Sequence, residues 1–316
     1  MSTFFKALEQ AERDRATLRR EPQSPPPVTE TPASVLVAEP PVVEEAPPPP
    51  QPEAAPVEVV APPRPAPRPW IETTDLGPDV AVGEIDEHLV SLLQPTSVAA
   101  ERYRVVRHCV EERRRSTGAQ VFAVSSPAVR DGKTTTVINL AGAIAQSAEA
   151  RVLIVETDLR QPSIAERFGL GKAPFRGLVD AILNPSLSLS DVVRRPPPYN
   201  LSVLLAGQPP ATPYEVLESP RLGELLAEAR RRYDVILLDT PPMVSVPDCR
   251  VIGKWVDGFI VVVAAHRTPR KALEEGLNLM EPSKVIGLVL SHDDRSFVNG
   301  GSYAPRSTRR MDAKTR

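Results

Sequence analysis

The sequence predicts an α/β fold in which a mostly parallel central sheet is flanked by helices on both faces. Six apolar runs, each bounded by turn signals, recur after residue 120 of the 316-residue chain. The runs are nearly continuous in apolar content rather than alternating, which is typical of strands buried on both faces. Helical patterns lie between most of the runs, and this alternation favours parallel strand pairing.

The expected elements follow from these patterns in chain order. We predict strands at Val121–Val124, Val152–Val155, Leu201–Leu205, Val235–Leu238, Phe259–Ala264 and Val285–Leu290. We predict the main helices at about Val98–Arg114, Lys133–Gln146, Pro220–Arg231 and Pro269–Met280. Ser97 is placed to cap the first of these helices, and Ser219, followed by Pro220, to cap the third. Because ligand sites of parallel sheets lie at the carboxyl ends of the strands, the residues that follow each run are the functional candidates.

A long proline-rich region precedes this pattern. About half of the 37 prolines lie between residues 21 and 70, where the composition cannot build a core. The sequence therefore predicts four parts: a short amphipathic helix at 1–20, a disordered Pro-rich linker at 21–80, a globular domain at 81–295 and a flexible basic tail at 296–316. The N-terminal helix is either a frayed tail or a docking peptide for a partner or a membrane surface.

Composition excludes several classes of protein. The formal net charge of −2 does not indicate a nucleic-acid binder. The two cysteines, Cys109 and Cys249, have no metal-ligand or redox spacing. No apolar run approaches the roughly 20 residues that a membrane-spanning helix needs, and the first 20 residues are charged throughout, unlike a secretory signal. We expect a cytoplasmic protein whose membrane contact, if any, is peripheral at the inner face of the plasma membrane.

The segment 126–135, SPAVRDGKTT, has the context of a phosphate-binding P-loop, because a predicted strand precedes it and a predicted helix follows it. In such a loop, backbone N–H groups and the positive end of the helix dipole converge on phosphate oxygens. Lys133 would reach the β- and γ-phosphates, and the Thr134 hydroxyl would hold Mg²⁺. Pro127 stands where the usual pattern has glycine. The predicted nucleotide-binding residues are Ala128, Val129, Arg130, Asp131, Gly132, Lys133, Thr134, Thr135 and Arg160.

Acidic residues follow two of the predicted strands. Glu156 and Asp158 come directly after the second strand, and Asp239 ends the fourth. In a P-loop fold Asp239 would support Mg²⁺, and the other two would supply a base or a water-positioning group near the γ-phosphate. Each acid alone would be better explained as a turn or helix-cap carboxylate. Together with the loop they predict the cofactors ATP and Mg²⁺, a catalytic set of Lys133, Glu156, Asp158 and Asp239, and a metal set of Thr134, Asp158 and Asp239.

These motifs together resemble the bacterial tyrosine kinase family, the cytoplasmic autokinases of capsular and exopolysaccharide systems. The matching segments are Ser-Pro ahead of Gly-Lys-Thr, ETDLRQP at 156–162, YDVILLDTPP at 233–242 with Asp248 after it, and ERYRVVR at 101–107. The resemblance extends from about Ile85 to Asp294. A P-loop domain of the kinase and ATPase type is thus expected at 81–295.

The resemblance implies an ATP-dependent protein tyrosine kinase that regulates polysaccharide biosynthesis and export. It implies that Lys133 and Thr134 bind phosphate and Mg²⁺, that the pair Glu156 and Asp158 carries catalysis, and that Asp239 supports the metal. It also implies a membrane partner that controls polysaccharide chain length. Other copies of the chain would be contacted through one face of the helix before the P-loop, at Glu101, Arg104 and Arg107. An ordinary solvated helix is the alternative for that face.

The sequence departs from the family pattern at three points. Glu156 replaces an aspartate, and one extra methylene displaces a carboxylate by roughly 1.5 Å, so Glu156→Asp is expected to raise turnover. Tyr303 is the one tyrosine after Asp294, where the family has a cluster. Ser291 replaces an asparagine expected near the adenine. An alternative function is therefore a regulatory P-loop ATPase or nucleotide-gated scaffold of the same machinery that does not phosphorylate tyrosine.

Two other classes are less compatible with the sequence. Cell-division and plasmid-partitioning ATPases carry a signature lysine where this chain has Ala128. A nucleotide-free interaction module conflicts with the presence of Lys133, Thr134 and Asp239.

Overall fold

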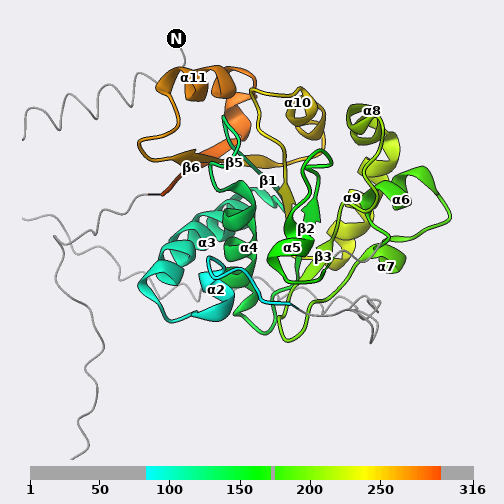
Figure 1. Cartoon of the computed structure of the whole chain (residues 1–316), viewed down its shortest axis with the longest axis horizontal. Helices are drawn as coiled ribbons and strands as arrows, with labels where there is room; N and C mark the ends of the chain where they lie inside the picture. Colours follow the sequence, from blue (N-terminus) through cyan, green and yellow to red (C-terminus); the bar gives the residue numbers. More distant parts are fainter. Residues whose placement is uncertain (1–82, 172–174, 293–316) are drawn as a thin grey trace, which may run out of the picture. The chain divides into compact units, whose positions relative to one another are not determined.

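Six parallel strands form the central sheet of the protein (Figure 1). The structure is a computed structural model that describes residues 83–171 and 175–292. The strand order is β3-β2-β4-β1-β5-β6. The strands are β1 (Val121–Ser125), β2 (Val152–Glu156), β3 (Ser202–Leu204), β4 (Val235–Asp239), β5 (Gly258–Ala264) and β6 (Val285–Ser291). All five strand pairings are parallel, so the predicted sheet is confirmed.

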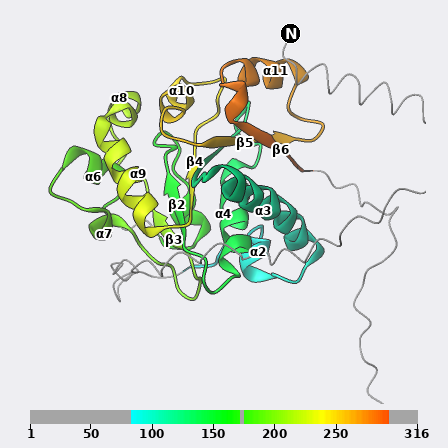
Figure 2. The same ribbon diagram turned by 180° about the vertical axis from the view of Figure 1, so that it is seen from behind.

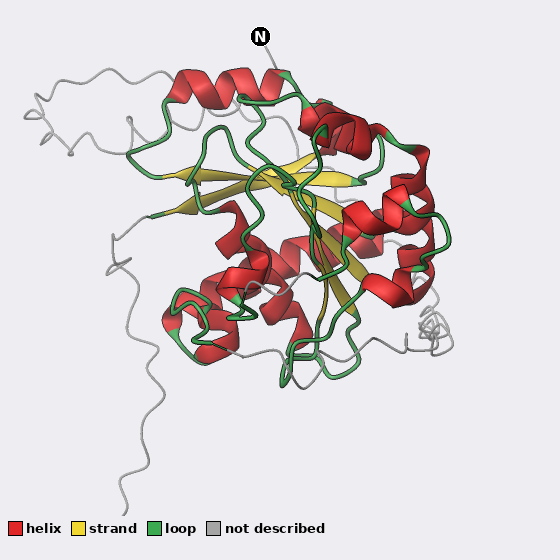
Figure 3. Ribbon diagram, turned by 45° about the vertical axis from the view of Figure 1, so that its right-hand side comes forward, coloured by secondary structure: helices red, strands yellow, loops and turns green. Residues whose placement is uncertain are grey.

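Helices cover both faces of this sheet. One face carries α2 (Val90–Leu93), α3 (Val98–Thr117), α4 (Lys133–Ala145) and α5 (Ile164–Arg167). The other face carries α6 (Leu178–Leu183), α7 (Leu189–Val192), α8 (Pro213–Glu218), α9 (Pro220–Arg232), α10 (Asp248–Ile252) and α11 (Arg270–Asn278), with the 3₁₀ turn η1 (Pro282–Lys284) before β6. Figure 2 shows α3 and α4 side by side from behind, and Figure 3 shows helices on both sides of the strands.

Each strand supplies side chains to two separate hydrophobic cores. In β1, Val121 and Ala123 belong to the core under α6 to α10, whereas Phe122 and Val124 belong to the core under α2 to α5. All four are fully buried. Successive side chains of a strand point to opposite faces, so a strand covered on both faces must be apolar throughout. Each large apolar side chain buried in this way contributes about 1.5–3 kcal/mol relative to exposure.

The predicted helix caps are present. The Ser97 hydroxyl accepts a hydrogen bond from the N–H of Ala100 at the start of α3, and the Ser219 hydroxyl accepts one from Arg221 at the start of α9. Helix α3 ends at Gly118, whose φ of +74° is the left-handed conformation that glycine adopts without strain. Six short helices of the described chain, α2, α5 to α8 and α10, were not predicted, because segments of four to six residues are too short to show a helical period.

The predicted N-terminal helix at 1–20, the linker at 21–80 and the basic tail at 296–316 all lie outside the described residues. These three assignments therefore stay predictions. Among residues 83–171 and 175–292, every helix is too short or too polar to cross a bilayer.

Candidate functional site

The P-loop lies between the end of β1 and the start of α4, at the carboxyl edge of the sheet. Gly132 precedes the first residue of α4 and has φ of +93°, so the loop turns into the helix through a left-handed conformation. Glycine adopts this conformation without the steric cost of a Cβ atom. Arg130 is also left-handed, at φ +62°. Lys133 is only 8% exposed at the helix start, although its side chain ends in a charged ammonium group. The sequence motif thus forms the strand, loop and helix that it predicted.

Asp131 braces the loop from within. Its carboxylate accepts a hydrogen bond from the N–H of Ala128 (3.0 Å) and another from the Thr268 hydroxyl (2.9 Å). The Ser291 hydroxyl donates to the backbone carbonyl of Asp131 (2.6 Å). The side chain of Asp131, predicted to contact nucleotide, therefore faces the protein. Sequence reasoning missed Thr268 and assigned Ser291 a different role, yet both lie where β5 and β6 reach their carboxyl ends, which was the available signal.

Asp239, at the end of β4, is the most electrostatically perturbed of the predicted site residues. It is 1% exposed, and its Oδ1 atom has no hydrogen-bond partner among the described residues. Burial raises the pKa of Asp239 to about 7, against the opposing effects of a hydrogen bond from Thr134 and the charge of Lys133. The nearby charges of Glu156 and Asp158 raise this pKa further. The predicted P-loop and strand-end residues therefore do lie together.

The backbone fixes the two acidic strand ends to each other. The register of β2 and β4 pairs Glu156 with Asp239. Beyond that pair, the N–H groups of Thr157 (2.8 Å) and Asp158 (3.0 Å) both donate to the carbonyl of Asp239. Asp158 is 8% exposed, and its carboxylate accepts a hydrogen bond from the N–H of Gln161 (3.1 Å). Asp158 is thereby held next to Asp239 at the edge of the P-loop.

The carboxylate of Glu156 is bonded to the backbone through both of its oxygen atoms. Oε1 accepts hydrogen bonds from the N–H groups of Ser163 (2.6 Å) and Ile164 (2.7 Å), and Oε2 accepts one from Ala206 (2.9 Å). The side chain is 2% exposed, and burial raises the pKa of Glu156 despite these donors. The shared carboxylate joins the start of α5 to the segment that follows β3. This arrangement differs from that of a base held open toward a phosphate.

Arg160 forms an ion pair with Asp248, and its predicted contact with nucleotide stays a prediction. Its Nε and Nη2 atoms donate to the two carboxylate oxygens at 2.8 and 3.0 Å. Asp248 is fully buried at the start of α10, and this bond raises the pKa of the Arg160 guanidinium. The pair ties the loop after β2 to α10.

The charged face of α3 is engaged within the chain. Arg104 forms an ion pair with Glu101 and donates to the side chain of Gln146 (3.1 Å), whereas Arg107 donates to Glu111 (2.6 Å) and to the carbonyl of Ala143 (2.9 Å). The contact of these residues with another copy of the chain stays a prediction.

The oxygen ligands at the carboxyl edge fit a magnesium ion whose remaining ligands come from a nucleotide. Across the described residues, no group of three His, Cys, Asp or Glu side chains is arranged to enclose a metal. Mg²⁺ in nucleotide enzymes is usually held by one or two carboxylates, with phosphates and water as further ligands. In the described residues, Oδ1 of Asp239 has no hydrogen-bond partner, and the Thr134 hydroxyl is hydrogen-bonded to the same carboxylate. These two groups are part of such a ligand set, which phosphates and water would complete.

This geometry defines the class of the protein: an α/β domain with the P-loop NTPase fold, in which the loop joins β1 to α4. A family model described as an AAA domain matches residues 121–267. The tyrosine-protein kinase YwqD of Bacillus subtilis is 29% identical over 209 residues, which span 66% of this chain and 86% of that protein. The tyrosine-protein kinase ptk of Acinetobacter johnsonii is 32% identical over 210 residues, which span 66% of this chain but only 28% of that protein.

A solved structure of a kinase domain is also similar to this chain. The crystal structure of the VpsO kinase domain is 32% identical and superposes with a TM-score of 0.52, covering 60% of this chain and 95% of that domain. The chain belongs to the bacterial tyrosine kinase family.

Proposed function

We propose that this protein is an ATP-dependent protein tyrosine kinase that phosphorylates copies of itself and regulates capsular or exopolysaccharide biosynthesis and export. The activity is supported by relatives that are named tyrosine-protein kinases. The polysaccharide role is supported by the resemblance of the motifs at 101–107, 126–135, 156–162 and 233–242. The observation that carries the proposal is the buried Asp239 beside Lys133 and Thr134, one oxygen of which has no hydrogen-bond partner in the described part of the chain.

The chain's own groups account for nucleotide binding. The N–H groups of residues 128–135 would surround the phosphates at the start of α4, where the helix dipole favours negative charge. Lys133 would place its ammonium on the β- and γ-phosphates, and its charge also faces Asp239. Mg²⁺ would be held by Thr134, Asp158 and Asp239, and when bound it would neutralise charge on the transferring phosphoryl group.

We infer that the two acids after β2 have different roles. Asp158 would accept the proton of the tyrosine hydroxyl while the tyrosine oxygen bonds to the γ-phosphorus and the bond to the β-phosphate oxygen breaks. Glu156 would act as a positioning residue, because its oxygens are occupied by the N–H groups of Ser163, Ile164 and Ala206. Its bonds shape the segment from which Asp158 projects.

The partners and location follow from the same family. We propose that copies of the chain meet through the α3 face of Glu101, Arg104 and Arg107, and that a membrane chain-length regulator binds the assembly. The protein would act in the cytoplasm, with peripheral association at the inner face of the plasma membrane.

A second candidate is a regulatory P-loop ATPase or nucleotide-gated scaffold of the same machinery. The occupied carboxylate of Glu156 favours it, since one expected catalytic acid is committed to structure. The tail sequence also favours it, because Tyr303 is the one tyrosine after Asp294.

Incubation of the purified chain with Mg-ATP separates these functions when phosphotyrosine and ADP are both measured. Phosphotyrosine formation that Lys133→Ala abolishes would support the kinase, and Tyr303→Phe would test the acceptor. ADP release without phosphotyrosine would support the ATPase. Absence of both products, with and without a candidate membrane activator, would contradict both functions.

A further inference from the structure

A cavity of about 360 Å³ lies at the edge of the sheet opposite the P-loop. It is bounded by the end of α3, the segment between α10 and β5, and side chains from α9 and η1. The lining residues used below are Arg113, Gly118, Arg230, Lys254, Asp257 and Lys284. The cavity adjoins the segments that lead into β1 and β5, whereas the P-loop leaves the far end of β1. The two places are therefore separated by the length of the strand.

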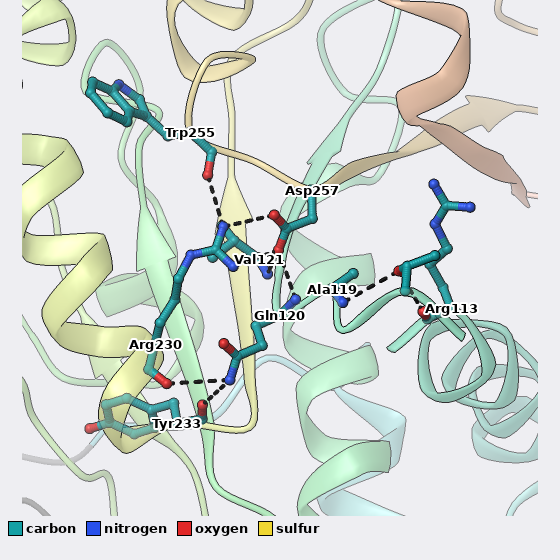
Figure 4. Close-up of polar contacts among 9 residues, drawn as sticks. Arg113, Ala119, Gln120, Val121, Arg230, Tyr233, Trp255 and Asp257 are labelled. Atoms are coloured by element: carbon teal, nitrogen blue, oxygen red, sulfur yellow. Dashed lines mark hydrogen bonds and ion pairs between the residues drawn. The ribbon is translucent and has the colours of Figure 1, made fainter. Parts of the chain in front are cut away.

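One ion pair in the cavity is complete. Arg230 reaches the carboxylate of Asp257 with both terminal nitrogens, at 2.7 and 2.8 Å, as Figure 4 shows. The same carboxylate accepts hydrogen bonds from the N–H groups of Gln120 (2.7 Å) and Val121 (2.9 Å). The negative charge of Asp257 is thus compensated by donors at the entry to β1 and β5.

The other cations of the cavity are not neutralised in this way. Arg113 donates to the carbonyl of Ser283 (3.3 Å), and Lys284 donates to the carbonyl of Gly253 (2.8 Å). A carbonyl accepts a hydrogen bond but carries no net charge. The Lys254 Nζ atom lies 3.5 Å from Oε1 of Glu218, and both side chains are more than half exposed. An ion pair exposed in this way is weak in water. Three positive charges from separate segments therefore face one cavity that contains a single, already compensated carboxylate.

Arg113 supplies a second, independent observation. Its Nε atom is buried and has no hydrogen-bond partner among the described residues. A buried polar group without a partner is unfavourable unless a ligand or water completes it. In Figure 4 the Arg113 side chain lies apart from the Arg230–Asp257 pair, with no contact drawn to that carboxylate. Within the described part of the chain this guanidinium therefore retains a donor that a ligand or water would complete.

We propose that this cavity binds a phosphate-bearing anion. Guanidinium groups bind phosphate through two parallel hydrogen bonds, and lysine adds a point charge. The volume is at the lower end of the roughly 300–1,000 Å³ typical of small-molecule sites. The bound anion would bridge Arg113 of α3 to Lys284 of η1, and so would stabilise the folded chain.

The test is a calorimetric titration of inorganic pyrophosphate into the full chain carrying Lys133→Ala, in buffer without magnesium, so that the P-loop contributes little. One pyrophosphate per chain is expected. Adding Arg113→Gln or Lys284→Gln should weaken this binding by at least about tenfold, as expected for the loss of one charged contact. Adding Arg102→Gln, which removes an exposed charge from the same helix far from the cavity, should leave binding unchanged. Thermal melts without ligand would verify that each variant is folded.

Two sources of phosphate are separated by a parallel sedimentation assay. Vesicles of phosphatidylcholine with and without about 20% phosphatidic acid would be mixed with the same variants. Sedimentation that needs phosphatidic acid, Arg113 and Lys284 would assign the site to a lipid headgroup. Pyrophosphate binding without such sedimentation would assign it to a soluble ligand. The proposal is overturned if neither probe binds, or if Arg113→Gln and Lys284→Gln bind as tightly as the chain that carries Lys133→Ala alone. Neither readout depends on kinase activity.

Discussion

Two aspartates at opposite edges of the sheet show how differently this fold treats a buried or half-buried acid. Asp239 ends β4 at the carboxyl edge, has an oxygen without a hydrogen-bond partner in residues 83–171 and 175–292, and has a pKa raised to about 7 by burial. Asp257 precedes β5 at the amino edge. Burial alone would raise the pKa of Asp257, but hydrogen bonds from Arg230, Val121 and Gln120 outweigh that effect and lower it.

The opposite pKa shifts distinguish Asp257, which stabilises the fold when it is ionised, from Asp239, which destabilises the fold when it is ionised. Asp257 is paired with an arginine and two amides, so its ionised form favours the native state. Asp239 is ionised at a cost that only a ligand or a cation can offset. An acid left incomplete at the carboxyl edge therefore indicates function, whereas a completed acid at the amino edge indicates stability.

The largest effect is expected for Lys133→Ala. Removing this charge should lower nucleotide turnover by on the order of 10²-fold or more, because a positioned cation at the transferring phosphate is lost. ADP release under saturating Mg-ATP is the measurement. Lys271→Ala, which removes an exposed lysine of α11, is the control and should retain full activity. Comparable turnover in both variants would show that the P-loop lysine is not part of the chemistry.

Asp239→Asn should have opposite effects on activity and stability. Turnover should fall by about 10²-fold. Without nucleotide, the variant should be more stable than the wild type above pH 7. The reason is that the native pKa of Asp239, about 7, exceeds its unfolded value of about 3.9. The folded wild type binds the extra proton between those values, so its stability falls as pH rises from about 4 to 7. Melting curves at pH 4 and pH 8 should show an advantage for the variant only at pH 8.

Glu156→Asp separates two interpretations of that residue. If Glu156 is a displaced catalytic acid, as its position in the motif suggests, the shorter side chain should raise turnover. If it is a positioning residue, aspartate cannot span from Ser163 to Ala206, and turnover should fall by about tenfold through misplacement of Asp158. The second outcome is expected from the three hydrogen bonds of the carboxylate. Initial rates over a range of ATP concentrations would decide between them.

The smallest effect is expected at the amino edge, for Asp257→Asn. Loss of the Arg230 pair should destabilise the fold by about 2 kcal/mol at pH 7 and leave turnover unchanged. Because the native pKa of Asp257 is lowered, its contribution is present above about pH 4 and is lost as pH falls through the native value. Urea unfolding at pH 7 and pH 3 measures this difference. The control Glu112→Gln, on the exposed surface of α3, should change neither the stability of the fold nor turnover.

The sequence was sufficient for the sheet and the P-loop but not for the direction in which the acids point. Apolar runs and the loop motif are local signals, and they predicted every strand of the described sheet. The bonding of Glu156 depends on Ala206, fifty positions away, and the brace on Asp131 depends on Thr268 and Ser291. The cavity beside Arg113 likewise requires segments that meet only in the folded chain. No local pattern encodes such meetings.

The end of β6 has a consequence for the tyrosine that follows it. A Cβ atom on Gly132 would lie 3.5 Å from Ser291 and 3.6 Å from His292, so the last described residues lie against the turn at the start of α4. Tyr303 comes eleven positions after His292. A fully extended chain of that length spans at most about 40 Å. Tyr303, the acceptor proposed above, would therefore lie within about 40 Å of the P-loop of its own chain, and a neighbouring copy would have to bring its own site within that distance to phosphorylate it.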